Sequence, residues 1–188
     1  DLVSGTPSSW NDLLEPSDDI KGKVTMLSTD RWLLAAGLLS LGYSVNETDP
    51  SKLNEAKEKL ILAKKNLLAY DDTVFYTKLV SGEAVIAHAW DGWCNYATWE
   101  NPDVKFVVPS EGSDLWVDTM VIMKASSNKD EAHAFINYIL DPAISTWTVE
   151  NIMYKVPNVA AMEATSGMFE QFPNLGMSIN ELLKNETM

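Results

Sequence analysis

The feature that most constrains the fold is an alternation of short apolar runs with longer amphipathic stretches. Short apolar runs of strand length occur at residues 23–27, 84–89, 104–108 and 116–123. Between them lie stretches in which apolar residues recur at helical spacing. The clearest of these follows Asp49 and Pro50 and continues to Leu67. Short strands alternating with helices predict an α/β architecture with a mainly parallel sheet.

Start and stop signals give the expected limits of the helices. Thr29 or Asp30 is a suitable N-cap for a helix that Gly42 ends, and Ser81-Gly82 ends another. A turn is expected at 153–158, and two short helical patterns lie in the tail on either side of 171–174. The expected helices span residues 10–14, 31–41, 51–67, 73–80, 129–140 and 142–149.

The net charge limits the kinds of partner that the chain is expected to bind. It is −13 for 188 residues, which argues against nucleic acid, since phosphate contacts need clustered Lys and Arg. An acidic protein can instead raise the local concentration of cationic ligands. Acidity that serves solubility alone is the alternative.

Metal, redox and catalytic motifs give no positive signal. Cys94 is the single cysteine, so no intrachain disulfide forms, and His88 and His133 are isolated from each other. Neither metal nor cofactor is therefore expected, and no nucleophile, P-loop or dinucleotide motif is present. No apolar run is long enough to span a bilayer, and residues 1–10 do not have the form of a signal peptide.

Two tryptophans stand beside carboxylates, and these are the candidate functional residues. Trp90 is followed by Asp91, and Trp116 is followed two residues later by Asp118. An indole face attracts a cation, and a neighbouring carboxylate adds a charge-assisted hydrogen bond to an ammonium group. Trp90 follows a predicted strand directly, at the sheet edge where ligands bind in α/β proteins. The alternative is that these tryptophans are large core residues.

Four segments together resemble the bacterial spermidine/putrescine-binding proteins, the receptors of ABC-type polyamine importers. They are LSTDRWLLAAGLLSLGYSVNETDPSKLNEA, AWDGW, VVPSEGSDLWVDTMVIMKASSNKDEAHAFINYILDP and IMYKVPNVAA, within residues 10–161. The resemblance implies a type II periplasmic-binding-protein-like fold, with two α/β lobes joined by a hinge. It also implies a polyamine ligand, an ABC permease partner, a periplasmic or extracytoplasmic location, and capture without catalysis.

The resemblance also implies roles for particular residues. Trp116 and Asp118 match a Trp-x-Asp pair in which the indole packs on the methylene chain and the carboxylate binds an amine. Trp90 matches a strand-end tryptophan of the other lobe, and Tyr154 matches an aromatic residue that lines the cleft.

One stretch departs from the family pattern. Arg31 matches the arginine of an Asp-x-Arg-Glu stretch, but Thr29 and Trp32 stand where the pattern often has Asp and Glu. Asp30 is adjacent and is the expected substitute for one lost carboxylate. A polyamine preference that differs from the family's is therefore one hypothesis.

The resemblance implies a division of the chain into four parts. Residues 1–10 are a linker or hinge entry, 11–112 the second lobe, 113–160 a return segment that belongs to the first lobe, and 161–188 C-terminal helices. On this interpretation the chain is a fragment that lacks an N-terminal part. Exposed apolar surface on the return segment would then be covered by a second chain or a swapped dimer.

Three other interpretations remain open at this point. The same fold could bind another cationic or polar small solute. The chain could belong to an enzyme whose catalytic half lies in a missing segment. It could also be a structural module in which the tryptophans are core residues.

Overall fold

The computed structural model describes residues 5–187. The chain divides into two compact units, which we call unit 1 (Asp1–Trp116 with Ser178–Met188) and unit 2 (Val117–Met177). Residues 1–4 of the predicted linker 1–10 lie outside the described residues. The same holds for residue 188 of the predicted C-terminal helices 161–188.

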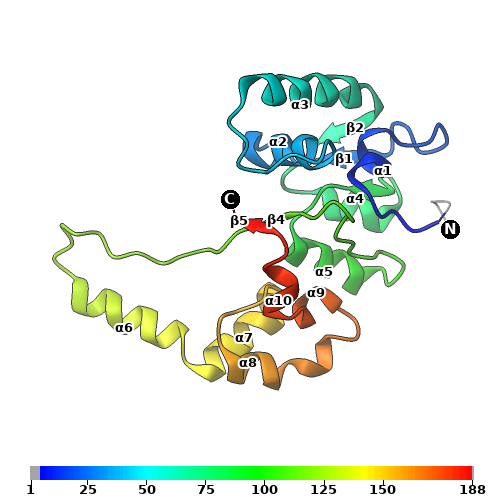
Figure 1. Ribbon diagram of the computed structural model, residues 1–188. Coiled ribbons are helices and arrows are strands. Elements are labelled where there is room, and N and C mark those ends of the chain that lie inside the picture. The colour runs from blue at the N-terminus through cyan, green and yellow to red at the C-terminus, as the bar shows by residue number, and fades with distance from the viewer. Residues whose placement is uncertain (1–4, 188) are drawn as a thin grey trace. The chain divides into compact units, whose positions relative to one another are not determined.

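Unit 1 is built on a three-stranded parallel sheet (Figure 1). β1 (Val24–Met26) lies between β2 (Leu67–Tyr70) and β3 (Ile86–Ala87). Val24, Thr25 and Met26 of β1 have no exposed surface, as expected for a parallel strand that is covered on both faces. The predicted α/β architecture with a parallel sheet is confirmed.

Local capping signals define the helices around this sheet. Ser9 and Asp12 form a capping box at the first helix, and Asp49 accepts the Ser51 N–H at the third. The fourth helix ends at Gly82, whose φ of 75° is left-handed. The helices of this part of unit 1 are α1 (Trp10–Leu14), α2 (Asp30–Leu39), α3 (Pro50–Ala63), the 3-10 turn η1 (Lys64–Asn66), α4 (Phe75–Ser81) and α5 (Asp91–Glu100).

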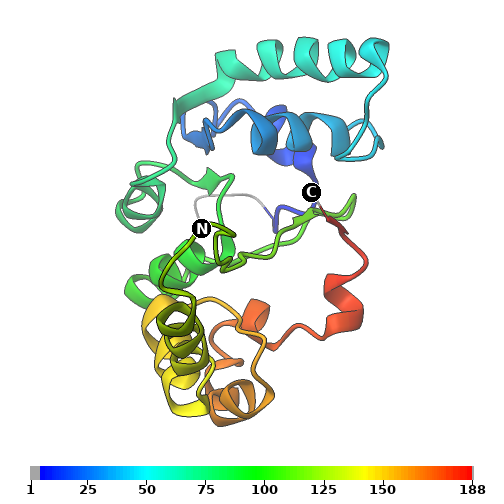
Figure 2. The same ribbon diagram turned by 90° about the vertical axis from the view of Figure 1, so that its left-hand side faces the viewer.

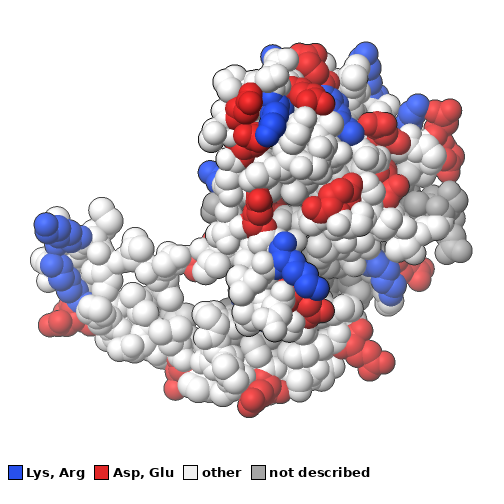
Figure 3. Space-filling view, viewed as in Figure 1, with Lys and Arg blue, Asp and Glu red and all other residues white. Residues whose placement is uncertain are grey.

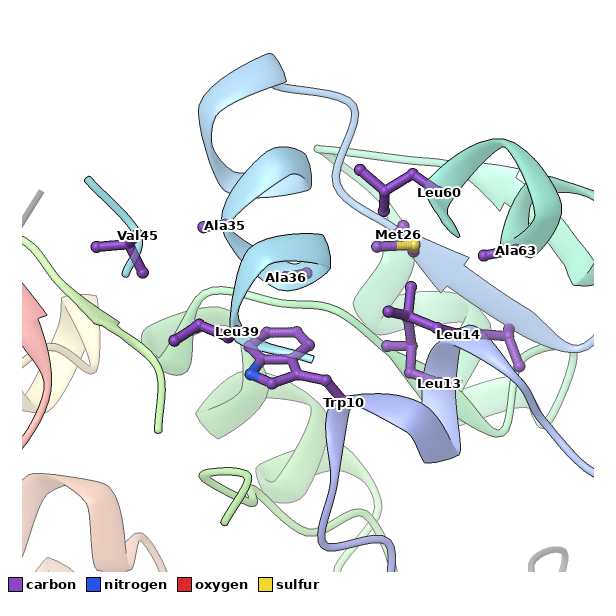
Figure 4. Packing of buried hydrophobic residues seen from close by; sticks show 11 residues of the cluster. Trp10, Leu13, Leu14, Met26, Ala35, Ala36, Leu39, Val45, Leu60 and Ala63 are labelled. Carbon is purple, nitrogen blue, oxygen red and sulfur yellow. The ribbon is translucent and has the colours of Figure 1, made fainter. Parts of the chain in front are cut away.

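The core of unit 1 lies among α1, α2, α3 and β1. Figure 4 shows Trp10, Leu13 and Leu14 of α1 turned toward side chains of α2 and β1, including the fully buried Met26. α2 and α3 lie side by side (Figure 1) and approach closely at Gly37. A Cβ atom at Gly37 would lie 3.0 Å from Leu60 Cδ1, so the small residue permits this approach.

A second, two-stranded parallel sheet uses the end of the chain. β4 (Asp114–Leu115) pairs with β5 (Glu186–Thr187), and Figures 1 and 2 both show the two strands side by side near the C-terminus. α10 (Ile179–Leu182) precedes β5 and begins with a capping box between Ser178 and Glu181. The last eleven residues thus belong with unit 1.

Unit 2 is helical in its regular elements: α6 (Lys129–Ile139), α7 (Pro142–Ile152), α8 (Val159–Ala164), the 3-10 turn η2 (Ser166–Met168) and α9 (Pro173–Gly176). α7 begins where Asp141 accepts the Ala143 N–H at 2.9 Å. It ends at Met153, whose φ of 64° is left-handed. Asn158 caps α8 and donates to the Leu140 carbonyl at 2.9 Å. The helices predicted at 129–140 and after Pro142 are confirmed.

Two predicted strands are wrong. Neither residues 104–108 nor residues 116–123 form a strand, and β4 ends at Leu115, just before the second segment. Val117, Val121 and Met123 are each more than 70% exposed. A strand is stable only beside a neighbour that completes its hydrogen bonds and covers a face, and no described residue supplies one here.

Two elements were missed from the sequence. The apolar spacing predicts a helix that continues to Leu67, but α3 ends at Ala63. Residues 67–70 form the strand β2 instead. α5 was also missed, because its sequence DGWCNYATWE combines three aromatic residues with Gly, Asn and Asp, which have modest or low helix propensity.

His88, directly after β3, gives a prediction about stability. Burial lowers its pKa to about 4, with Asp72 acting in the opposite direction. Between the ordinary value and about 4, the unfolded chain binds a proton that folded His88 does not, so stability falls as pH falls through this window. We expect a loss of about 3 kcal/mol, since each pKa unit corresponds to about 1.4 kcal/mol.

This pH dependence is measured by chemical denaturation of the unaltered chain and of His88→Phe. The variant keeps an aromatic ring against Trp10, whose centroid lies 5.1 Å from that of His88, but cannot be protonated. The difference in unfolding free energy between the two proteins should shift in favour of the variant by about 3 kcal/mol between about pH 7 and pH 4. A constant difference would contradict the neutral, buried state of His88.

Candidate ligand-binding site

The carboxyl ends of β1, β2 and β3 meet at one edge of the sheet, where ligands bind in parallel α/β folds. Two carboxylates at this edge hold the loops together. The Ser28 N–H, after β1, donates to Asp72 Oδ1 at 2.7 Å, and the Ser28 hydroxyl donates to Oδ2. Asp71 is buried, accepts the Thr73 and Val74 N–H groups, and pairs with Lys78. Asp71 and Asp72 therefore shape the edge.

A cluster of four aromatic residues, here called the tryptophan cluster, occupies the same edge: Trp32, Phe75, Trp90 and Trp116. The Trp32 ring lies 6.1 Å from Trp90 and 6.5 Å from Trp116, both edge to face at 89°. Phe75 lies 6.4 Å from Trp90. These are favourable aromatic geometries. Trp32 thus joins the two predicted tryptophans.

The segments that follow the three strands place three of these rings. Trp32 lies in the first turn of α2, after β1, and Trp90 is the N-cap residue of α5, after β3. Phe75 begins α4 and is fully buried, so it forms the floor of the cluster. Trp32 and Trp90 are half-buried, which leaves part of each indole accessible to a ligand.

Trp116 is placed from the far end of the chain. It follows β4, and β4 is held by β5 and by the Ser113 N–H, which donates to Asn185 Oδ1 at 2.8 Å. Glu186 of β5 accepts the Val45 N–H at 2.8 Å. A loop between α2 and α3 thereby fixes β5, which in turn fixes β4 and the tryptophan beside it.

Asp114 of β4 has unusual electrostatics. Its Oδ2 atom and the Trp32 Nε1 atom are both buried, and neither makes a hydrogen bond of good geometry. Burial raises the pKa of the Asp114 carboxyl, and its own backbone, the Trp32 indole, Ser113 and Arg31 lower it by less. Thus the carboxylate is costly to leave unpaired.

The other predicted residues of unit 1 lie next to the tryptophan cluster in sequence. Asp30 begins α2 and is exposed. Arg31 is exposed and donates to Asn46 Oδ1 at 3.0 Å, which ties α2 to the loop that follows it. Asp91 begins α5 and is half-buried.

Asp118 and Tyr154 belong to unit 2. Asp118 is exposed and lies outside any helix or strand, and Tyr154 is half-buried just after the end of α7. The tryptophan cluster is therefore formed within unit 1, and the roles of Asp118 and Tyr154 remain predictions.

Sequence reasoning missed Trp32, Phe75 and Asp114 as members of the site. Trp32 appeared only as a departure from the family pattern, although it follows a strand at the same edge as Trp90. Asp114 stands two residues before Trp116, and alternate residues of a strand share a face. That spacing is the signal that could have identified it.

Other chemistries have no clear site in the described part of the chain. Cys94 is buried, and burial raises the pKa of its thiol to about 12, so it is a neutral packing residue. Residues 5–187 contain no group of three or more His, Cys, Asp or Glu side chains placed to hold a metal ion. Within the same residues, the helices are too short or too polar to cross a membrane.

Comparison with known proteins places this chain in a family. Residues 1–175 match the model of the bacterial extracellular solute-binding proteins, and the chain belongs to that family. It is 30% identical over 178 residues to the spermidine/putrescine-binding periplasmic protein 1 of Haemophilus influenzae, covering 95% of this chain and 49% of the relative. It is 31% identical over 170 residues to the putrescine/cadaverine-binding protein of Pseudomonas aeruginosa, covering 86% of this chain and 48% of the relative.

The fold agrees with a solved structure. The spermidine/putrescine ABC transporter substrate-binding protein of Streptococcus pneumoniae superposes with a TM-score of 0.81 at 30% identity, covering 100% of this chain and 57% of that one. The predicted periplasmic-binding-protein-like fold is confirmed. The chain spans about half the length of the curated relatives that it matches.

Glu186 gives a prediction about how the site is held. Glu186→Ala removes the acceptor for the Val45 N–H and the Ser44 hydroxyl, so β5 and its partner β4 should open more often. Loss of about 1 kcal/mol of hydrogen bonding corresponds to about fivefold faster amide exchange. Hydrogen exchange at residues 113–116 measures this.

The matched control is Glu83→Ala, which removes the same charge from an exposed position. It should leave exchange at 113–116 unchanged. Equal exchange in Glu186→Ala and the unaltered chain would show that β5 does not hold Trp116 in place.

Proposed function

We propose that this chain forms part of an extracytoplasmic receptor that captures polyamines for an ABC importer and performs no catalysis. The observation that carries the proposal is the tryptophan cluster at the carboxyl edge of a parallel sheet. The names of the relatives support the ligand class: one is a spermidine/putrescine-binding protein and another a putrescine/cadaverine-binding protein.

The physical chemistry of a polyamine suits such a site. Its methylene chain can pack on indole faces, and its ammonium groups are attracted to the same rings. Desolvating an ammonium is costly unless a carboxylate pairs with it. Figure 3 shows acidic side chains spread over the face that carries α2 and α3, interspersed with Lys and Arg. The net charge of −13 also favours cation encounter.

The departures from the family pattern change the proposed contacts. Thr29 lacks a carboxylate and Trp32 places an indole in the cluster. Carboxylates at other positions would therefore bind the ammonium groups of the ligand. Asp30, Asp91 and Asp118 are the residues that we propose for this role. A ligand preference that differs from that of a site with more carboxylates follows from this exchange.

The division into lobes is part of the proposal. Residues 11–112 form the second lobe, and 113–160 return to the first lobe of the full receptor. The exposed apolar side chains of Val117, Val121 and Met123 support this, because such a run needs a covering surface. The first lobe, or a second chain that exchanges elements, would supply it, and ligand would stabilise hinge closure through its higher affinity for the closed state.

Asp118→Ala tests the proposal. We expect polyamine affinity to fall by about 10- to 100-fold, as for the loss of a charged hydrogen bond of about 1.5–3 kcal/mol. Quenching of tryptophan fluorescence by spermidine and putrescine, against sodium chloride at matched ionic strength, measures the affinity.

Asp103→Ala serves as the control, because Asp103 is an exposed carboxylate in a turn of unit 1. Its affinity should equal that of the unaltered chain. Absence of any polyamine-specific quenching in the unaltered chain would overturn the proposed function, whereas unchanged affinity in Asp118→Ala would remove only that residue from the site.

A further inference from the structure

We propose that Asp114 is an ammonium-binding carboxylate of the tryptophan cluster, a role that the family resemblance did not suggest. This inference rests on the proposed function and deepens it. Thr29 and Trp32, at the start of α2, carry no negative charge. Asp114 of β4 would supply a carboxylate in their place.

The first observation is the state of the carboxyl group itself. Asp114 Oδ2 is buried and makes no hydrogen bond of good geometry. Burial raises the pKa of the carboxyl, although the Trp32 indole and Ser113 lie close enough to lower it in part. Buried carboxylate oxygens nearly always have a partner, and leaving one without a partner is costly. An ammonium group is a donor that satisfies this oxygen and also neutralises the charge.

The second observation is the position of Asp114 in the site. It is the first residue of β4 and stands two residues before Trp116, which directly follows this strand. The Trp32 indole, which packs against both Trp90 and Trp116, lies close enough to influence the Asp114 carboxyl. An amine that lies along these rings would therefore have this carboxylate within reach.

The charged groups near Asp114 have other partners, so Asp114 is the carboxylate proposed to bind a cation in this part of the cluster. Arg31 acts on it electrostatically but donates to Asn46 in the neighbouring loop. Glu186, its register partner on β5, accepts from Ser44 and Val45. Glu186 is thus committed to holding the strand.

The competing explanation is that Asp114 only positions the Trp32 indole. Trp32 Nε1 is itself buried without a hydrogen bond of good geometry, so a positioning role leaves both atoms poorly satisfied. The two explanations differ in what restores binding. A ligand contact needs a carboxylate, whereas an acceptor for an indole N–H can be an amide oxygen.

The experiment is a titration of the purified chain with spermidine and with putrescine by tryptophan fluorescence at constant ionic strength. Asp114→Asn keeps the shape and an acceptor oxygen but removes the charge, and Asp114→Glu restores it. Asp103→Asn removes one charge from an exposed position and is the matched control. Thermal melting of each variant reports on the fold.

We expect Asp114→Asn to lower affinity by about tenfold or more, Asp114→Glu to recover at least part of that loss, and Asp103→Asn to bind as the unaltered chain does. Binding by Asp114→Asn equal to that of the unaltered chain would overturn this inference and leave the proposed function standing. A loss in Asp114→Asn that comes with a lowered melting temperature and no recovery in Asp114→Glu would also overturn it, in favour of a positioning role. Failure of the unaltered chain to bind either polyamine would overturn the proposed function itself.

Discussion

The pairing of β1 with a parallel strand on each side is the constraint on which the rest of unit 1 depends. Val24, Thr25 and Met26 have no exposed surface, so their backbone groups must be satisfied by neighbours. The backbone bonds extend past the strand ends: Asp71 N–H donates to Met26 at 2.8 Å, and His88 N–H donates to Thr25 at 2.9 Å. The three strands therefore end together at one edge of the sheet, and the segments that follow them carry Trp32, Phe75 and Trp90 to that edge.

A second, weaker constraint completes the site. β4 and β5 are two residues each and depend on hydrogen bonds from side-chain and backbone groups of a third segment, residues 44–46. Asn46 Nδ2 donates to the Thr187 carbonyl at 2.9 Å, while Glu186 accepts from Ser44 and Val45. Trp116 and Asp114 are thus positioned by contacts from distant parts of the sequence.

The sequence was sufficient where structure is local. The buried run at 23–27 contains β1, and the predicted start signals at Thr29 and Asp49 stand at real helix starts. Trp90 could be placed at the edge because it closely follows a strand. The remaining features depend on contacts that no local pattern records. The pairing of Asp114 with Glu186 spans most of the second half of the chain, and the apolar run at 116–123 forms no strand because no described neighbour pairs with it.

The central claim is that the tryptophan cluster binds cationic amines, and the indole N–H signals of the seven tryptophans test it most directly. In a nuclear magnetic resonance titration with spermidine, the signals of Trp32, Trp90 and Trp116 should shift in a saturable manner. Trp10, whose indole donates to the Gly112 carbonyl at 2.9 Å, and the exposed Trp99 should not move. Shifts spread evenly over all seven, or equal shifts with sodium chloride at the same ionic strength, would contradict the account.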